Sequence, residues 1–122
     1  MKRFILFSVI LLGIGLMAVS CQKEKNPRLV GKWGCYQILW THNSKVDECD
    51  PADPSTQLVF EADGKMYAPM KPDNKSNWYT KGNNLYMNFL TTEFAFSDDN
   101  HMTIKYSDDQ AYAHVEYYRR VN

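Results

Sequence analysis

From Leu29 onward, apolar and polar residues alternate in short runs that are separated by turn-forming residues. A period of two is typical of strands that bury one face, and no stretch shows the 3.6-residue period of an amphipathic helix. Asp63 and Gly64 lie between two such runs and are a strong hairpin signal, because glycine accepts the positive φ that the turn requires. The pattern therefore predicts an all-β domain over residues 29–122.

The alternating runs predict eight strands, at residues 31–40, 57–61, 65–69, 77–81, 85–90, 92–97, 101–107 and 111–121. Residues 41–56 are acidic, contain two prolines and are expected to form one long connection. The turn between the fifth and sixth strands, at Thr91 and Thr92, is weakly marked. Eight antiparallel strands with short connections predict a small closed up-and-down barrel, which leaves no unpaired sheet edge. An open sandwich would have the same periodicity.

Residues 1–20 have a different pattern, that of a secretory signal peptide. Lys2 and Arg3 precede the apolar run 4–19, and a small residue, Ser20, precedes Cys21. The run of about 16 residues is shorter than the roughly 20 that a membrane-spanning helix requires. We therefore expect a cleaved signal peptide rather than a permanent transmembrane helix.

The residues around the expected cleavage point, "AVSC", resemble the lipobox of bacterial lipoproteins. The resemblance implies that Cys21 becomes the lipidated first residue, so that its acyl chains anchor the protein to a membrane. Gln22 after the cysteine is similar to sequences sorted to the outer membrane, with the periplasmic and the cell-surface face both open. Residues 21–28 are polar and would form a tether that reaches at most roughly 23 Å from the anchor.

The charge of the chain does not favour nucleic acid as a partner. The sequence holds 14 basic and 14 acidic residues, and loss of Lys2 and Arg3 leaves 12 basic residues and a formal charge of −2. The basic residues are scattered rather than clustered. Three tryptophans and eight tyrosines suit strands with a packed interior.

Cys35 and Cys49 are the two cysteines of the expected barrel domain. Outside the cytoplasm they can form a disulfide, which would close a loop of about 15 residues and stabilise the fold by about 3 kcal/mol. The alternative is two separate thiols, one facing inward on a strand and one in a loop. A zinc site is not expected, because the sequence has no C-x-x-C motif and His42 is the nearest imidazole.

The stretch "GKW" at residues 31–33 resembles the Gly-x-Trp motif of the lipocalin and wider calycin barrels. The arginines in "YYRRV" are similar to the residue that these barrels place over the tryptophan, and "LVFEADGK" and "YTKGNNLYM" resemble segments of lipocalin-like lipoproteins from Bacteroides-type bacteria. The resemblance implies a lipocalin-like barrel closed at one end by Trp33. The motif selects Arg120 as its partner, whereas strand parity through Ala113, Val115 and Tyr117 selects Arg119.

A lipocalin-like barrel of eight strands is either filled by side chains or wide enough for one small ligand. Parity predicts an apolar interior lined by Leu58, Phe60, Leu85, Met87, Phe89, Phe94, Phe96, Met102 and Ile104. We therefore expect non-catalytic binding of a small apolar ligand. The barrel can equally be filled by side chains, because these are large residues in a short domain, so the filled barrel stays the alternative.

No spacing of residues indicates catalysis, a cofactor or a metal site. Of the three histidines, His114 has an acidic neighbour of the same strand parity, Glu116, and such pairs are common by chance. The acidic residues of "DECDPAD" lack the regular ligand spacing of an EF-hand, so a solvated loop is expected there. We therefore expect neither an enzyme nor a cofactor-binding protein.

The second class of function is a lipid-tethered module that binds another protein or inhibits an enzyme. The segment "NWYTKGN" resembles part of the compact barrel lipoproteins that inhibit lysozyme. Trp40, Trp78 and Tyr79 would then be exposed contact residues, because aromatic residues dominate interface hot spots. They can equally be cross-strand packing residues on the outer wall.

Overall fold

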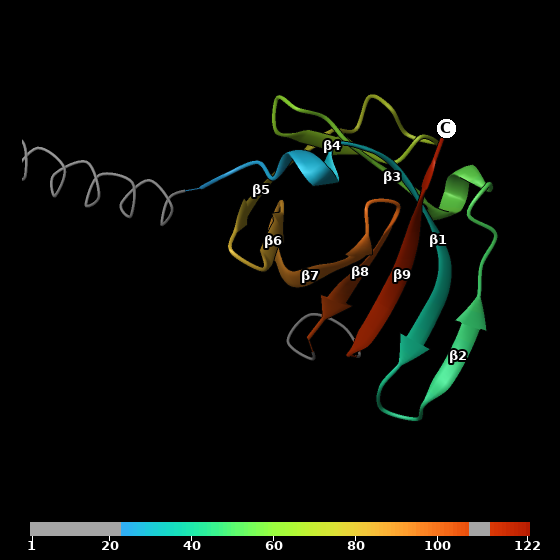
Figure 1. The fold of residues 1–122 in the computed structure, drawn as a ribbon. Coiled ribbons are helices and arrows are strands. Elements are labelled where there is room, and N and C mark those ends of the chain that lie inside the picture. Colours follow the sequence, from blue (N-terminus) through green and yellow to red (C-terminus); the bar gives the residue numbers. More distant parts are fainter. Residues whose placement is uncertain (1–22, 108–112) are drawn as a thin grey trace, which may run out of the picture.

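The structure of the protein is a computed structural model that describes residues 23–107 and 113–122. Two short 3₁₀ helices, η1 (Pro27–Leu29) and η2 (Pro54–Thr56), accompany one sheet (Figure 1). The described residues form nine strands: β1 (Gly31–Trp40), β2 (Lys45–Glu48), β3 (Gln57–Phe60), β4 (Lys65–Tyr67), β5 (Ser76–Lys81), β6 (Asn84–Met87), β7 (Leu90–Asp98), β8 (His101–Tyr106) and β9 (His114–Val121).

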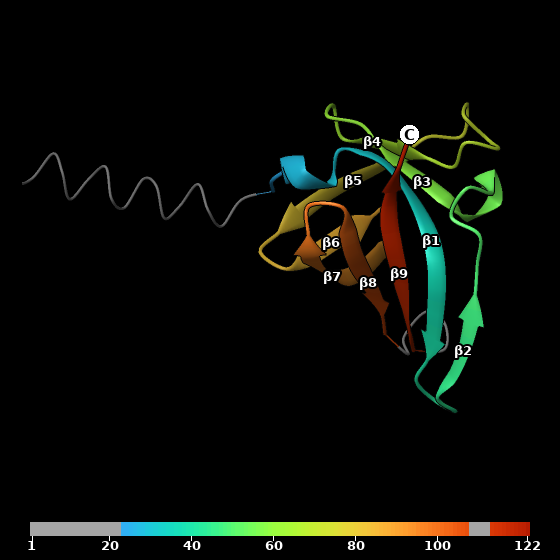
Figure 2. The ribbon, with the colours of Figure 1, turned by 45° about the vertical axis from the view of Figure 1, so that its right-hand side comes forward.

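The sheet closes on itself to form a barrel. Its strand order is β2-β1-β3-β4-β5-β6-β7-β8-β9, and β9 also pairs with β1. Every pairing is antiparallel, and Figures 1 and 2 both show β1 and β9 side by side at the seam. Eight of the nine strands, β1 and β3 to β9, make the closed ring. The predicted fold class, an all-β eight-stranded antiparallel up-and-down barrel, is confirmed.

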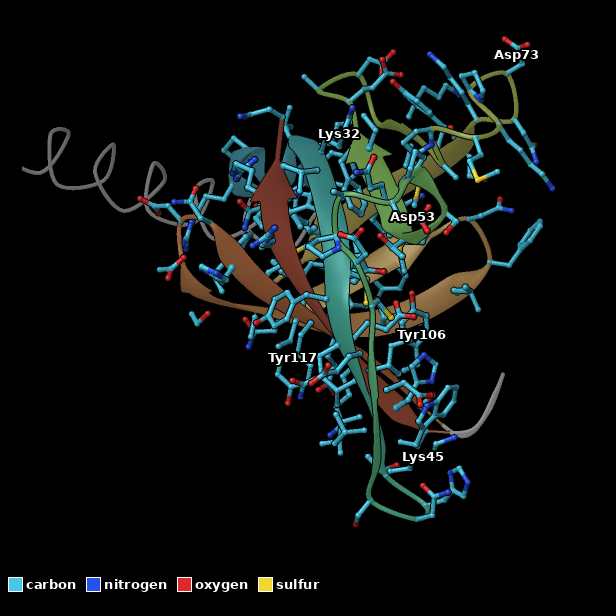
Figure 3. All side chains as sticks on the ribbon, turned by 90° about the vertical axis from the view of Figure 1, so that its right-hand side faces the viewer. Lys32, Lys45, Asp53, Asp73, Tyr106 and Tyr117 are labelled. Atoms are coloured by element: carbon cyan, nitrogen blue, oxygen red, sulfur yellow. The ribbon has the colours of Figure 1, made fainter. Side chains whose placement is uncertain are left out.

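The ninth strand, β2, lies where the sequence predicts a long connection. Residues 31–34 of β1 pair with β3, and residues 37–40 pair with β2 along the same edge. The first half of β1 thus belongs to the ring, and the second half extends beyond it between β2 and β9 (Figure 2). In Figure 3, Lys45 marks the far end of this extension. The sequence pattern does not reveal β2, because most of its side chains are exposed and no apolar face sets a period.

The turn between β6 and β7 comes earlier than predicted. Residues 88 and 89 form it, and β7 begins at Leu90, so the expected turn at Thr91 and Thr92 is wrong. Asn88 has a φ of 56°, a left-handed conformation that asparagine tolerates better than most residues. The exposed Phe89 in this turn hid the break in the apolar pattern.

The core fills one end of the barrel and continues along its axis. It consists of Leu29, Trp33, Cys35, Phe60, Met66, Trp78, Leu85, Met87, Phe94, Met102, Ile104 and Tyr118. Every strand of the ring buries at least one large apolar side chain, and this burial supplies the main stabilisation of such a small domain. Within residues 23–107 and 113–122, no helix is long and apolar enough to cross a bilayer.

The segment expected to be a free tether is partly built into the fold. The backbone N–H of Glu24 donates to the Thr80 carbonyl at 2.9 Å, and the Thr80 N–H donates back at 2.6 Å. The Lys23 ammonium lies 4.6 Å from the centre of the Tyr79 ring. This antiparallel bridge pairs the segment with β5, so the spacer predicted over residues 21–28 is shorter than expected.

Candidate functional site

One end of the barrel is closed by Trp33 and Arg120. The Trp33 indole is fully buried, and its Nε1–H donates to the Leu29 carbonyl at 2.8 Å. The Arg120 guanidinium lies over the indole, with Cζ 4.2 Å from the ring centre. It also donates to the carbonyls of Val30 at 2.9 Å and Arg28 at 2.7 Å. The last strand of the ring is thereby fastened to the chain that leads into the first.

Gly31 explains why a glycine stands two residues before the tryptophan. Its φ is 132°, in the region that favours glycine, and a Cβ built on it would lie 2.6 Å from Arg120 Nη1. Any larger residue would therefore displace the guanidinium from its place over Trp33. The Gly-Lys-Trp motif and Arg120 form one unit.

The strand-parity prediction for Arg119 placed the wrong face of β9 inward. Arg119 is exposed, whereas Tyr118 and His114 on the other face are buried. In Figure 3, Tyr117 and Tyr106 lie on opposite sides of β1. The interior residues of β9 are therefore His114, Glu116, Tyr118 and Arg120.

A cup opens at the end of the barrel opposite Trp33. Its volume is about 370 Å³, within the range of small-molecule sites. Seven of its lining residues come from the start of β3, the start of β5, the β6–β7 turn with its flanks and the end of β8. In an antiparallel ring these strand ends meet at one mouth. The lining is formed by Leu58, Met66, Ser76, Met87, Asn88, Phe89, Leu90 and Tyr106.

The predicted apolar lining is divided between the packed core and this cup. Phe60, Leu85, Phe94, Met102 and Ile104 are buried in the core, and Phe96 is partly buried against it. Leu58 and Met87 reach the cup. Phe89 is 91 % exposed, so its predicted inward position is wrong: it stands on the rim of the cup, in a turn rather than a strand.

The inner face of β9 brings a carboxylate into the barrel beside two tyrosines and a histidine. The Tyr118 hydroxyl donates to Glu116 Oε1 at 2.8 Å, and His114 Nε2 lies 3.4 Å from Glu116 Oε2. Tyr106, which lines the cup, stacks on His114 with ring centres 4.5 Å apart. The sequence signal for this group was the shared parity of His114 and Glu116. Same-face pairs of this kind are common by chance, so the shared parity alone did not indicate a site.

The surroundings of Glu116 hold its neighbours in their neutral forms. Burial, reinforced by the Glu116 charge, raises the pKa values of Tyr106 and Tyr118 well above the ordinary tyrosine value. Burial, with a smaller contribution from the same carboxylate, also raises the pKa of the Cys35 thiol to about 12. At neutral pH these three groups therefore offer O–H and S–H donors and no negative charge of their own.

Cys35 and Cys49 are both present as free thiols, so the structure contains no disulfide between them. They are nevertheless neighbours. The Cys49 N–H donates to the carbonyl of Tyr36, the residue after Cys35, at 3.0 Å. The Cys35 thiol donates to the Gln37 carbonyl at 3.5 Å. Cys35 faces the core and Cys49 follows β2, which is the inward-strand and loop arrangement that the alternative prediction described.

The acidic stretch 47–53 makes local hydrogen bonds. Asp47 accepts from the Trp40 indole at 2.8 Å, Asp50 from the Ala52 N–H at 3.0 Å, and Asp53 from the Ser55 N–H at 3.0 Å. The Asp53 hydrogen bond, which caps η2, lowers the pKa of that carboxyl. Within the part of the chain that the structure describes, no group of three His, Cys, Asp or Glu residues is arranged to hold a metal ion.

The three aromatic residues expected as exposed contacts have different positions. Trp78 is buried, packs edge-on against Phe60 and donates to the Glu61 carbonyl at 3.0 Å, so that expectation is wrong for it. Tyr79 stacks on Tyr86 on the outer wall, with ring centres 4.5 Å apart. Trp40 lies 4.7 Å from His114, beside the polar group of β9.

Comparison with known proteins finds no matching family model, no similar curated protein and no similar solved structure. A functional proposal therefore has to start from the geometry of the barrel, in which the cup beside Tyr106 is a concave and largely apolar feature.

Proposed function

We propose that the protein is a lipocalin-like, outer-membrane lipoprotein that binds one small, largely apolar molecule without chemical conversion. The observation that carries the proposal is the cup of about 370 Å³ at the mouth opposite Trp33. Leu58, Met66, Met87 and Leu90 supply its apolar wall. A concave site of this size with an apolar wall and few polar groups has the character of a small-molecule site.

The location in the cell envelope is supported by the sequence before the barrel. The positive end, the apolar run 4–19 and the "AVSC" segment together have the form of a lipoprotein signal. The anchor would be Cys21, and the bilayer would be the first partner of the protein.

The test is binding of the neutral fluorescent probe N-phenyl-1-naphthylamine to the chain from residue 21, with Cys21→Ser to remove the anchor. We expect saturable fluorescence with one site per chain. Leu90→Arg places a charge on the wall of the cup and should weaken binding at least tenfold, since burying an unpaired charge costs more than about 1.4 kcal/mol.

Val46→Arg is the matched control. Val46 is 49 % exposed and Leu90 is 37 % exposed, but Val46 lies on β2, away from the cup. This variant should bind the probe as the parent protein does. Binding that is absent, or that Leu90→Arg and Val46→Arg weaken equally, would contradict a ligand site in the cup.

A second function, docking of a protein partner on a filled barrel, is favoured by one observation. Phe89 is 91 % exposed on the rim, and Met70 in the β4–β5 connection is 65 % exposed. Exposed apolar side chains of this size are typical contact residues of interfaces. If the partner is a protein, Phe89→Ser should abolish its capture while leaving probe binding to the Leu90 wall measurable.

A further inference from the structure

The shape of the cup does not determine which head group a ligand would carry. The charged and polar side chains on the inner face of β9 provide that information. We propose that the cup selects amphiphiles with a cationic head group, such as a primary amine, and that Glu116 is the residue that selects them. This inference rests on the proposed function, because it assigns the ligand class of the same site.

Glu116 lies inside the barrel. It pairs across the sheet with Ile104, which is fully buried, and directly paired residues of neighbouring strands project to the same side of a sheet. The residues two positions away on β9, His114 and Tyr118, are also buried. The Glu116 side chain nevertheless keeps 19 % of its surface exposed. A carboxylate in the barrel is therefore within reach of solvent and of a ligand.

Tyr106 connects this carboxylate to the cup. Its ring is part of the cup lining and stacks on His114, whose Nε2 lies 3.4 Å from Glu116 Oε2. The Glu116 charge also helps to raise the pKa of the Tyr106 hydroxyl. An apolar tail against Leu58, Met87 and Leu90 would therefore leave its head group at Tyr106, next to Glu116. An aromatic ring beside a carboxylate is a favourable site for an ammonium group, because both attract positive charge.

The charges around the site favour a cation over an anion. None of the residues that line the cup is a lysine or arginine. The groups that face Glu116 from β1, β8 and β9 are Cys35, Tyr106, Tyr118 and His114, and the thiol and both hydroxyls stay neutral because burial raises their pKa values. Asp47 on β2 accepts a hydrogen bond from Trp40 and lies 3.6 Å from the Lys45 ammonium, so this ion pair adds no net charge. A ligand carboxylate placed here would meet like charge.

The experiment compares three ten-carbon probes that differ in their head group: decylamine, decanol and decanoate. Displacement of N-phenyl-1-naphthylamine from the Cys21→Ser chain measures the affinity of each probe. The pH is 8, above the usual titration range of imidazole, and each probe is kept below the concentration at which it forms micelles. We expect the affinity order decylamine, decanol, decanoate, with at least tenfold between the first and the last.

Glu116→Gln keeps the shape of the side chain and an oxygen that accepts from Tyr118, and it removes the charge. It should reduce the difference between decylamine and decanoate to threefold or less while decanol affinity stays unchanged. Glu93→Gln is the matched control, because Glu93 is an exposed glutamate that pairs with Lys105 outside the cup, and it should preserve the order.

The outcomes separate this inference from the proposed function. Decanoate that binds as tightly as decylamine, or an order that persists in Glu116→Gln, overturns the selection of cations and leaves the ligand site standing. A protein that binds neither the dye nor any of the three probes overturns both.

Discussion

At the scale of single residues, the closed end of the barrel depends on Arg120, which its contacts with the start of the chain hold in place. Gly31 leaves space for the guanidinium, Trp33 provides the ring beneath it, and the carbonyls of Arg28 and Val30 accept its hydrogen bonds. The preceding residue, Arg119, is also an arginine, but its side chain is exposed. Substitutions of Arg119 and Arg120 therefore compare the contribution of one residue type to stability in two environments.

We expect Arg120→Ala to lower the free energy of unfolding by about 2 kcal/mol, because it removes hydrogen bonds from a charged donor and the contact with Trp33. Arg119→Ala should change it by less than about 0.5 kcal/mol, as is usual for exposed positions. Urea unfolding followed by tryptophan fluorescence measures both. Equal losses in the two variants would show that Arg120 has no special role.

At the scale of the strands, the regular alternation of apolar residues is what the sequence predicted well. The β3–β4 hairpin at Asp63-Gly64 and β5 lie within about two residues of their expected bounds. The pattern failed where exposure or polarity hides the period. β2 is charged and mostly exposed, and Phe89 is apolar but stands in a turn.

The face of β9 was misread for a different physical reason. Val115 and Tyr117 have the apolar character expected of an inner face, whereas the true inner face carries His114 and Glu116. These polar residues are tolerated inside because the Tyr118 hydroxyl donates to the Glu116 carboxylate and His114 lies beside it, contacts that no local pattern reveals. The sequence therefore placed His114 and Glu116 on one face of the strand but not inside the barrel, whereas the apolar side of the candidate site was partly predicted.

The docked segment before η1 gives a prediction at this scale. Proline at position 24 has no N–H, so Glu24→Pro removes the donor to the Thr80 carbonyl. Loss of about 1 kcal/mol of pairing should raise the rate of trypsin cleavage after Lys25 about fivefold.

Glu24→Ala keeps the backbone hydrogen bonds with Thr80 and is the control. It should be cleaved at the rate of the parent protein. Rapid cleavage after Lys25 in the parent chain itself would mean that residues 23–26 are not held against β5.

At the scale of the whole molecule, the barrel encloses several groups that must stay neutral for it to fold. Cys35, Tyr106 and Tyr118 all have folded-state pKa values above their ordinary ones, because burial disfavours their charged forms. Above their ordinary pKa values, the unfolded chain releases these protons while the folded chain keeps them. Stability must therefore fall as the pH rises.

We expect the free energy of unfolding to be nearly constant from about pH 7 to pH 8 and to fall from about pH 9 upward. A group that is protonated in the folded chain and deprotonated in the unfolded chain lowers the free energy of unfolding by up to about 1.4 kcal/mol per pH unit. Urea titrations at pH 8, 9, 10 and 11 measure the fall. Tyr106→Phe should make it shallower above pH 10, and Tyr86→Phe, on the outer wall, should leave it unchanged. A flat profile to pH 11 would contradict enclosure of these groups.

The seam between β1 and β9 also sets the order in which the protein can acquire its structure. Its register joins Lys32 to Val121 and Trp33 to Arg120, residues that are far apart in the chain, whereas the other ring contacts are mostly between consecutive strands. Contacts of such long sequence separation carry the largest loop-closure entropy and form slowly. A chain still emerging from a ribosome can build the hairpins from β3 to β8, but it cannot close the ring until β9 has followed. The same seam that completes the barrel thus keeps the chain open while it is being synthesised.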